Sequence, residues 1–124
     1  MDDLTFGDYL RSLRKKQDPP MTQSDLALLI GRTPMTISQF EIGKNAPPQG
    51  DLLEKIISVM RLTAEQANQL RFLSSKSRKA IPSDIEKYFF SHPSIYRVIY
   101  EAQKLKKDDT FWNEISERIG NSYE

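Results

Sequence analysis

Few side chains in this sequence are suited to catalysis or to metal binding. The 124 residues contain no cysteine and one histidine, which excludes a disulfide scaffold, an iron–sulfur site and a cysteine zinc finger and argues against a histidine-built metal site. The sequence holds no nucleophile–base pair and no glycine loop of the kind that cradles phosphate. We therefore expect no catalytic residue, no metal and no cofactor. The chemistry that remains is hydrogen bonding and charge pairing, which is the chemistry of a binding protein.

Two short helices joined by a tight turn are expected between residues 22 and 44, and they would position most of these polar groups. Each helix has a threonine suited to cap its start and a glycine suited to end it, because glycine reaches the left-handed conformation without a Cβ penalty. These positions are Thr22 and Gly31 for the first helix and Thr33 and Gly43 for the second. A helix, a turn and a second short helix make a helix-turn-helix geometry, in which the second helix enters the DNA major groove.

The residue order of this stretch, T-Q-S-D-L-A, then I-G-R-T, then T-I-S-Q-F-E-I-G-K, resembles the lambda-repressor and Cro-like (XRE) DNA-binding domain. The resemblance runs from about Phe6 to Leu73. The residues that carry it at the family's spacing are Leu26, Ala27, Gly31, Ile37, Ser38, Glu41, Gly43 and Pro47. It implies an all-α fold, with a compact five-helix DNA-binding domain followed here by a short helical C-terminal extension.

The resemblance also implies which side chains touch DNA. The expected base contacts, on the outward side of the second helix, are Thr33, Pro34, Met35, Thr36, Ser38 and Gln39. The expected phosphate contacts are Gln23, Arg32, Lys44 and Asn45. The Gln39 amide is suited to a two-bond contact with adenine, and Met35 to a thymine methyl group. Because Pro34 and Met35 stand where family members often carry hydrogen-bonding side chains, we expect DNA shape to carry part of the readout.

One charge pair is expected inside the domain rather than on the DNA. In the resembled family, the arginine corresponding to Arg14 pairs with the glutamate that ends the recognition helix, here Glu41. We interpret this pair as structural, because removal of one member would leave the other charge desolvated. Leu28 and Leu29 stand where the family usually places polar residues, and the sequence leaves open whether they extend the core or meet the C-terminal segment.

Charge and pattern divide the chain into three segments. We expect residues 1–73 to form the DNA-binding domain, residues 74–80 a basic linker, and residues 81–124 a helical extension. The linker is expected because this stretch lacks apolar periodicity and contains three cations. Residues 1–80 carry a net charge of +3 and residues 81–124 a net charge of −2, a distribution that suits DNA binding by the first part.

The extension carries more aromatic and branched side chains than its short helices can bury alone. Its last helix is expected to present an apolar surface made by Phe111, Trp112, Ile115 and Ile119. A small domain rarely leaves a surface of that kind uncovered. We expect this surface to mediate homodimerisation or to bind a protein partner.

These features together predict a sequence-specific transcriptional regulator that binds double-stranded DNA. We expect a repressor that binds a palindromic operator as a homodimer, through a recognition helix at residues 34–41. The alternative is the antitoxin of a toxin–antitoxin pair, whose C-terminal helices bind a toxin while its DNA-binding domain represses its own operon. The longest apolar run, Leu26–Ile30, is too short to span a membrane, and the chain opens without a signal-peptide pattern, so we expect a cytoplasmic protein.

Overall fold

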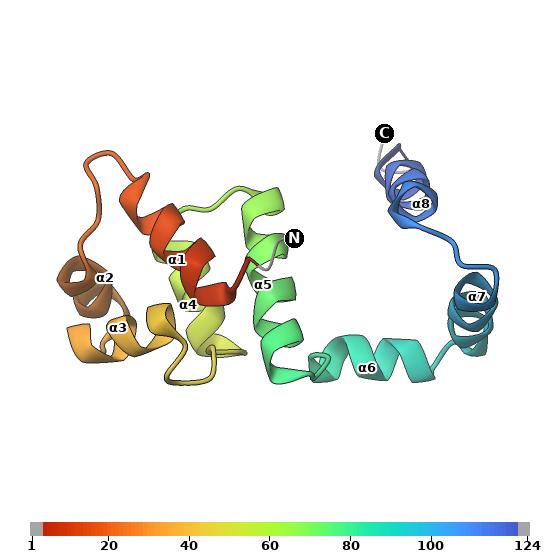
Figure 1. Ribbon diagram of the computed structural model, residues 1–124, viewed down its shortest axis with the longest axis horizontal. Coiled ribbons are helices and arrows are strands. Elements are labelled where there is room, and N and C mark those ends of the chain that lie inside the picture. Colours follow the sequence, from red (N-terminus) through yellow and green to blue (C-terminus); the bar gives the residue numbers. More distant parts are fainter. Residues whose placement is uncertain (1–3, 122–124) are drawn as a thin grey trace. The chain divides into compact units, whose positions relative to one another are not determined.

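The computed structural model describes residues 4–121, and every regular element in that range is a helix (Figure 1). The prediction of an all-α fold is confirmed. In chain order the helices are α1 (Phe6–Lys15), α2 (Gln23–Ile30), α3 (Pro34–Ile42), α4 (Asp51–Val59), α5 (Ala64–Arg78), α6 (Ser83–Phe90), α7 (Pro93–Lys104) and α8 (Asp109–Asn121). Residues 1–3 and 122–124, at the outer ends of the two expected domains, lie outside the described residues.

The chain divides into two compact units, Met1–Pro82 and Ser83–Glu124. The first unit contains α1 to α5 and the second contains α6 to α8. None of these helices, within the described part of the chain, combines the length and the hydropathy that crossing a bilayer requires.

The core of the first unit is built from one face of each of its five helices. On α1 the side chains of Phe6, Leu10 and Leu13, spaced four and three residues apart, are all buried, as expected for an amphipathic helix. The other helices contribute Leu26, Ala27, Ile30, Ile37, Phe40, Leu53, Ile56, Ile57, Met60, Ala67, Leu70 and Leu73. Leu28 is 82% exposed and Leu29 48% exposed, so these two leucines do not extend the core.

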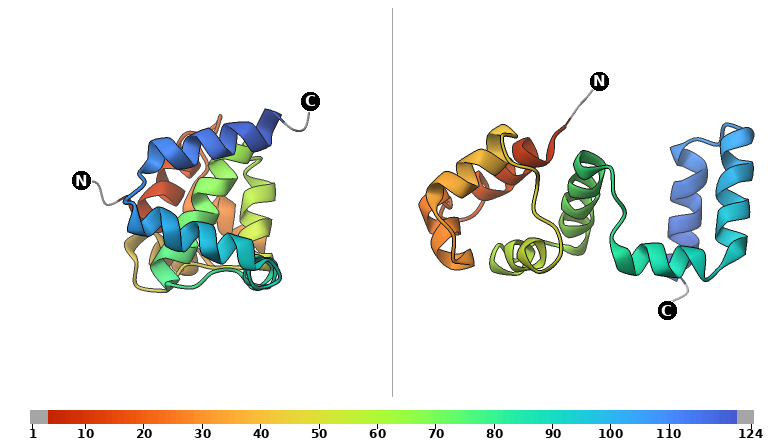
Figure 2. Two further views of the ribbon diagram at one scale, coloured as in Figure 1. Left: turned by 90° about the vertical axis from the view of Figure 1, so that its right-hand side faces the viewer. Right: turned by 90° about the horizontal axis from the view of Figure 1, so that it is seen from below.

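Helix α3, the expected recognition helix, is held by two neighbours. It packs against both α1 and α2, while α2 also packs against α4 and α1 against α5. Figure 2 shows these five helices from two further sides. One flank of α3 is therefore anchored in the unit, and only the remaining flank is available to another molecule.

The ends of α2 and α3 follow from local chemistry. The Thr22 hydroxyl accepts the backbone N–H of Asp25 at 3.0 Å, and the Asp25 carboxylate accepts the backbone N–H of Thr22 at 2.9 Å, which is a reciprocal capping box. Gly31 ends α2 with φ at 71° and Gly43 ends α3 with φ at 81°. Both are left-handed conformations that glycine adopts without a Cβ penalty.

The expected linker at residues 74–80 requires a correction, because α5 continues as a helix to Arg78. Ser74 is 1% exposed, and its hydroxyl donates to the carbonyl oxygen of Pro48 at 2.7 Å. The guanidinium of Arg78 donates to the carbonyl oxygen of Pro47 at 2.6 Å. The two prolines follow α3, so these two hydrogen bonds tie the end of α5 to the chain that leaves α3. The polar stretch is a docked helical turn.

The second unit has little interior of its own. Helix α6 packs against α7, and Ala102 is the one buried residue among the described side chains of this unit. The large apolar side chains exposed there are Ile85, Tyr88, Phe90, Tyr96, Val98, Ile99, Tyr100, Leu105 and Ile119. The apolar surface therefore lies mainly on α6 and α7.

The four residues of the surface expected on the last helix differ in exposure. Phe111, Trp112 and Ile115 are half-buried, and Ile119 is 58% exposed. The rings of Phe111 and Trp112 meet edge to face with their centroids 4.9 Å apart, so each covers part of the other. Of the four residues expected to face a partner, Ile119 is the one that is largely exposed.

Candidate nucleic-acid interface

The candidate interface is made by α2, the turn at Gly31 and α3. In the left-handed conformation of Gly31 the chain reverses direction, and the backbone N–H of Arg32 donates back to the carbonyl oxygen of Ala27 at 2.9 Å. Helix α3 begins two residues later with Pro34 at its first position, where a backbone N–H would have no partner inside the helix. Gly31 ends α2 and Thr33 caps the start of α3, so the turn between the two helices is short.

Helix α3 has a buried face and an outward face. Ile37 is fully buried and Phe40 is 7% exposed, so neither is available to DNA. Among the six expected base contacts, Thr33, Pro34 and Met35 are exposed, while Thr36, Ser38 and Gln39 are half-buried. Met35, at 65% exposure, is a large apolar side chain standing in solvent.

Two of the expected base contacts, Thr33 and Thr36, form hydrogen bonds with each other. The Thr33 hydroxyl accepts the backbone N–H of Thr36 at 3.3 Å, and the hydroxyl groups of the two threonines lie 3.1 Å apart. This arrangement caps the N-terminus of α3. It also occupies part of the hydrogen-bonding capacity of both hydroxyls.

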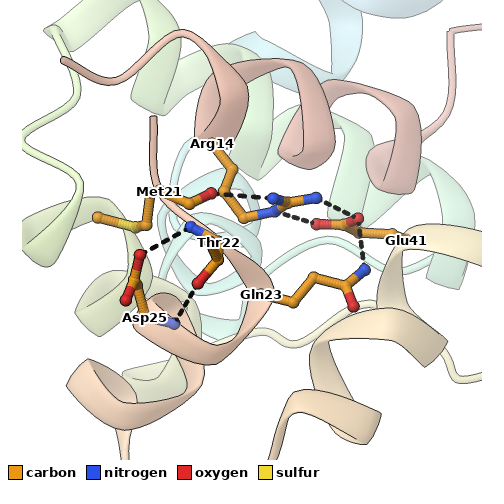
Figure 3. A network of polar contacts seen from close by, with 6 residues as sticks. All are labelled: Arg14, Met21, Thr22, Gln23, Asp25 and Glu41. Carbon is orange, nitrogen blue, oxygen red and sulfur yellow. Dashed lines mark hydrogen bonds and ion pairs between the residues drawn. The ribbon is translucent and has the colours of Figure 1, made fainter. Parts of the chain in front are cut away.

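A buried network ties the end of α3 to α1 and α2, as Figure 3 shows. Arg14 on α1 and Glu41 on α3 form a two-pronged ion pair, with Nε donating to Oε2 at 2.8 Å and Nη2 donating to Oε1 at 2.9 Å. The third prong of the guanidinium, Nη1, donates to the carbonyl oxygen of Met21 at 2.9 Å. Arg14 is 6% exposed and Glu41 8% exposed. Their charges therefore face each other and not a ligand.

Gln23, expected to contact phosphate, is also part of this network. Its Nε2 donates to Oε1 of Glu41 at 3.0 Å (Figure 3). One amide hydrogen is thus committed to the protein, and the second remains for a phosphate oxygen because a primary amide carries two. Gln23 therefore joins the first turn of α2 to the last turn of α3, a link that the sequence pattern did not predict.

The start of α2 has the chemistry of an anion-binding surface. The first backbone N–H groups of a helix have no partner within it and carry partial positive charge. A shallow hollow at the start of α2 is lined by Arg14, Lys15, Pro20, Met21, Thr22, Gln23, Ser24 and Pro34. In the first turn of α2, the hydrogen bonds from the backbone and then the side chain of Thr22 hold the pKa of Asp25 below its ordinary value. This hollow brings one expected phosphate contact, Gln23, beside one expected base contact, Pro34.

The other expected phosphate contacts lie at the two ends of α3. Arg32, Lys44 and Asn45 are exposed. The guanidinium of Arg32 donates to the carbonyl oxygen of Gly31 at 3.1 Å, and the amide Nδ2 of Asn45 donates to Oε1 of Gln39 at 2.7 Å. The second of these contacts joins an expected phosphate contact to an expected base contact.

The fold and this geometry define a helix-turn-helix protein. In comparisons with known proteins, the chain is similar to a protein of Bacillus subtilis (strain 168) named as an uncharacterized HTH-type transcriptional regulator, RghRB, with 27% identity over 97 residues. The matched region is 78% of this chain and 66% of that protein, so the chain spans slightly less than two thirds of the relative's length. No family model and no solved structure matches the chain.

The match to the Bacillus protein is not confined to the helix-turn-helix. Its 97 residues exceed the 82 of the first unit, so the similarity reaches into α6 or beyond. The relative therefore shares part of the second unit as well.

Proposed function

We propose that this chain is a sequence-specific transcriptional regulator of the lambda-repressor and Cro-like (XRE) kind, with α3 as its recognition helix. The observation that supports this best is the two-faced α3, anchored by buried Ile37 and Phe40, whereas Met35 is exposed and Ser38 and Gln39 are half-buried. The name of the similar Bacillus protein supports the same class. In this proposal the protein acts by binding and not by catalysis.

Two kinds of contact make up the proposed complex. The exposed cations Arg32 and Lys44, together with the start of α2, would bind phosphates and set the register of the protein on the duplex. Gln39 would read a base edge in the major groove, with adenine as the natural partner of its amide, and Met35 would pack on a thymine methyl group. A bound protein of this kind represses by covering a promoter.

Replacement of the proposed reader tests this function. Gln39→Ala should weaken binding to a duplex selected by the wild-type protein by about 1–3 kcal/mol, because one two-bond base contact is lost. Binding to scrambled DNA should change little. Gln69→Ala is a matched control, since Gln69 is an exposed glutamine on α5, outside the helix-turn-helix. An equal loss on selected and scrambled DNA would show that Gln39 contacts phosphate rather than a base.

We further propose that the second unit makes the protein a homodimer that matches a palindromic operator. Its large apolar side chains on α6 and α7 are mostly exposed, and Ala102 is the one buried residue among its described side chains, which is too little interior for an isolated fold of this size. Residues 81–124 carry a net charge of only −2, so like charges oppose the pairing of two copies only weakly. A second copy would supply the missing interior.

Truncation after Pro82 tests the dimer, because all core residues of the first unit precede that point. The full-length protein should sediment as a dimer, whereas residues 1–82 should sediment as a folded monomer. The shortened protein should bind the operator about 10²–10⁴-fold more weakly, because the linkage between two half-sites is lost. A full-length protein that stays monomeric at micromolar concentration, with and without operator DNA, would refute the dimer. The antitoxin alternative, in which a toxin covers α6 and α7, would then take its place.

A further inference from the structure

We propose that Asn45 is a positioning residue, which holds the amide of Gln39 in the orientation from which Gln39 reads a base. This inference rests on the proposed DNA-binding function and adds to it a second determinant of base preference. The determinant lies outside the recognition helix, in the turn that follows Gly43.

The backbone already holds Asn45 against the last turn of α3. In the left-handed conformation of Gly43 the chain folds back, so that the N–H groups of Lys44 and Asn45 both donate to the carbonyl oxygen of Gln39, at 2.9 and 3.2 Å. The N–H of Gly43 points to the same oxygen. The position of Asn45 relative to Gln39 is therefore set by main-chain hydrogen bonds and does not depend on the rotamer of either side chain.

A side-chain hydrogen bond then joins the same two residues. Nδ2 of Asn45 donates to Oε1 of Gln39 at 2.7 Å. A glutamine side chain has several rotatable bonds, and ordering it on binding costs free energy that an existing hydrogen bond removes in advance. The side-chain oxygen Oε1 of Gln39 has room to accept a second hydrogen bond, and Nε2 of the same amide still offers both of its hydrogens. The two-bond contact with adenine thus remains open while the amide plane is held.

This role differs from the phosphate contact expected for Asn45 in what it does to specificity. A phosphate contact strengthens binding to every sequence alike. A positioning residue changes the preference among bases at one operator position, and it does so only while Gln39 is present. The ratio of the affinities for the preferred and the other base pairs therefore distinguishes the two roles, whereas the affinity for a single duplex does not.

The experiment begins with a duplex selected from a random pool by the full-length wild-type protein. The operator position read by Gln39 is the one at which Gln39→Ala loses its preference. Dissociation constants are then measured for the four base pairs at that position with the wild type, Asn45→Ala, Gln39→Ala and the double variant. Lys44→Ala is the matched control, because Lys44 is the exposed neighbour of Asn45 in the same turn. Circular dichroism checks that each variant is folded.

We expect Asn45→Ala to reduce the discrimination between the preferred and the other base pairs by about 2- to 10-fold, the cost of ordering one flexible side chain. In the Gln39→Ala background it should produce no further change in discrimination. Lys44→Ala should weaken all four duplexes alike and lower the salt dependence of binding.

Three results would overturn the inference. An equal loss on all four duplexes with Asn45→Ala would make Asn45 a phosphate contact. A change in discrimination that persists without Gln39 would make Asn45 a base reader in its own right. Unchanged affinity and discrimination would show that Gln39 does not need the bond. In each of these cases the proposed function stands, whereas a wild-type protein that selects no sequence would refute both.

Discussion

A close approach between α1 and α3 predicts that Gly7 tolerates no side chain. Gly7 lies buried in α1, opposite the C-terminal end of α3. A Cβ atom added there would overlap the carbonyl oxygen of Glu41 and would lie 2.7 Å from the carbonyl oxygen of Phe40. Both obstacles are backbone atoms, so no side chain can rotate to make room. Gly7→Ala therefore requires that α1 and α3 move apart.

The size of the effect follows from two opposing terms. Overpacking of a well-packed interface costs about 1–3 kcal/mol, and gaps of 0.5–1 Å forfeit a quarter to a half of the dispersion energy of the contacts they open. Alanine gains back at most about 1 kcal/mol over glycine in helix propensity. Separation of the helices also stretches the Arg14–Glu41 pair across the same interface. We expect a net loss of about 1–3 kcal/mol in the free energy of unfolding.

Thermal unfolding followed by far-ultraviolet circular dichroism measures this loss. For a unit of 82 residues, the midpoint should fall by about 4–8 °C per kcal/mol. Gly120→Ala is the control, because Gly120 also lies in a helix but an added Cβ meets nothing within 4 Å. That variant should be unchanged or slightly more stable. An unchanged or raised midpoint for Gly7→Ala would refute the close packing of α1 on α3.

Two further predictions compare a buried ion pair, Arg14–Glu41, with an exposed one, Glu54–Arg71. Glu41→Ala should lower the free energy of unfolding by about 3–5 kcal/mol, because it leaves the Arg14 charge buried and without its carboxylate. Glu54→Ala should lower it by less than about 1 kcal/mol, because the partner of Glu54, Arg71, is half-exposed. Urea unfolding measures both losses, and equal losses would contradict the argument. The hydrogen bond from Arg71, followed by the charge of Arg71, holds the pKa of Glu54 below its ordinary value of 4.5. The pair therefore contributes its full stabilisation when the pH is above this ordinary pKa, and the contribution disappears as the pH falls through the lowered pKa. Urea unfolding of the wild type between neutral pH and roughly pH 3 should therefore show a slightly steeper loss than that of Arg71→Ala, and parallel curves would show that the pair contributes nothing.

Much of the first unit could be predicted because its signals are local. Thr22 and Asp25 are three residues apart and cap α2 by hydrogen bonds that involve only each other, so the pattern is sufficient to place the helix start. The glycines that end α2 and α3 act through their own backbone torsions. The outward face of α3 follows from helical periodicity once its start is known. The bounds of α2 and α3 and the faces of α3 were therefore determined by the sequence itself.

What the sequence did not determine are the contacts between residues far apart in the chain. The pairing of Arg14 with Glu41, 27 positions apart, was expected only from a family resemblance, and the hydrogen bond of Gln23 to Glu41 was not expected at all. Residues 74–78 lack apolar periodicity and were assigned to a linker, yet they are helical, and Ser74 bonds a carbonyl 26 positions away. Periodicity describes which face of a helix is apolar, whereas an isolated polar partner leaves no periodic trace. Only the packing of α1 and α2 against α3, and of α5 against the chain that leaves α3, decides which polar groups meet.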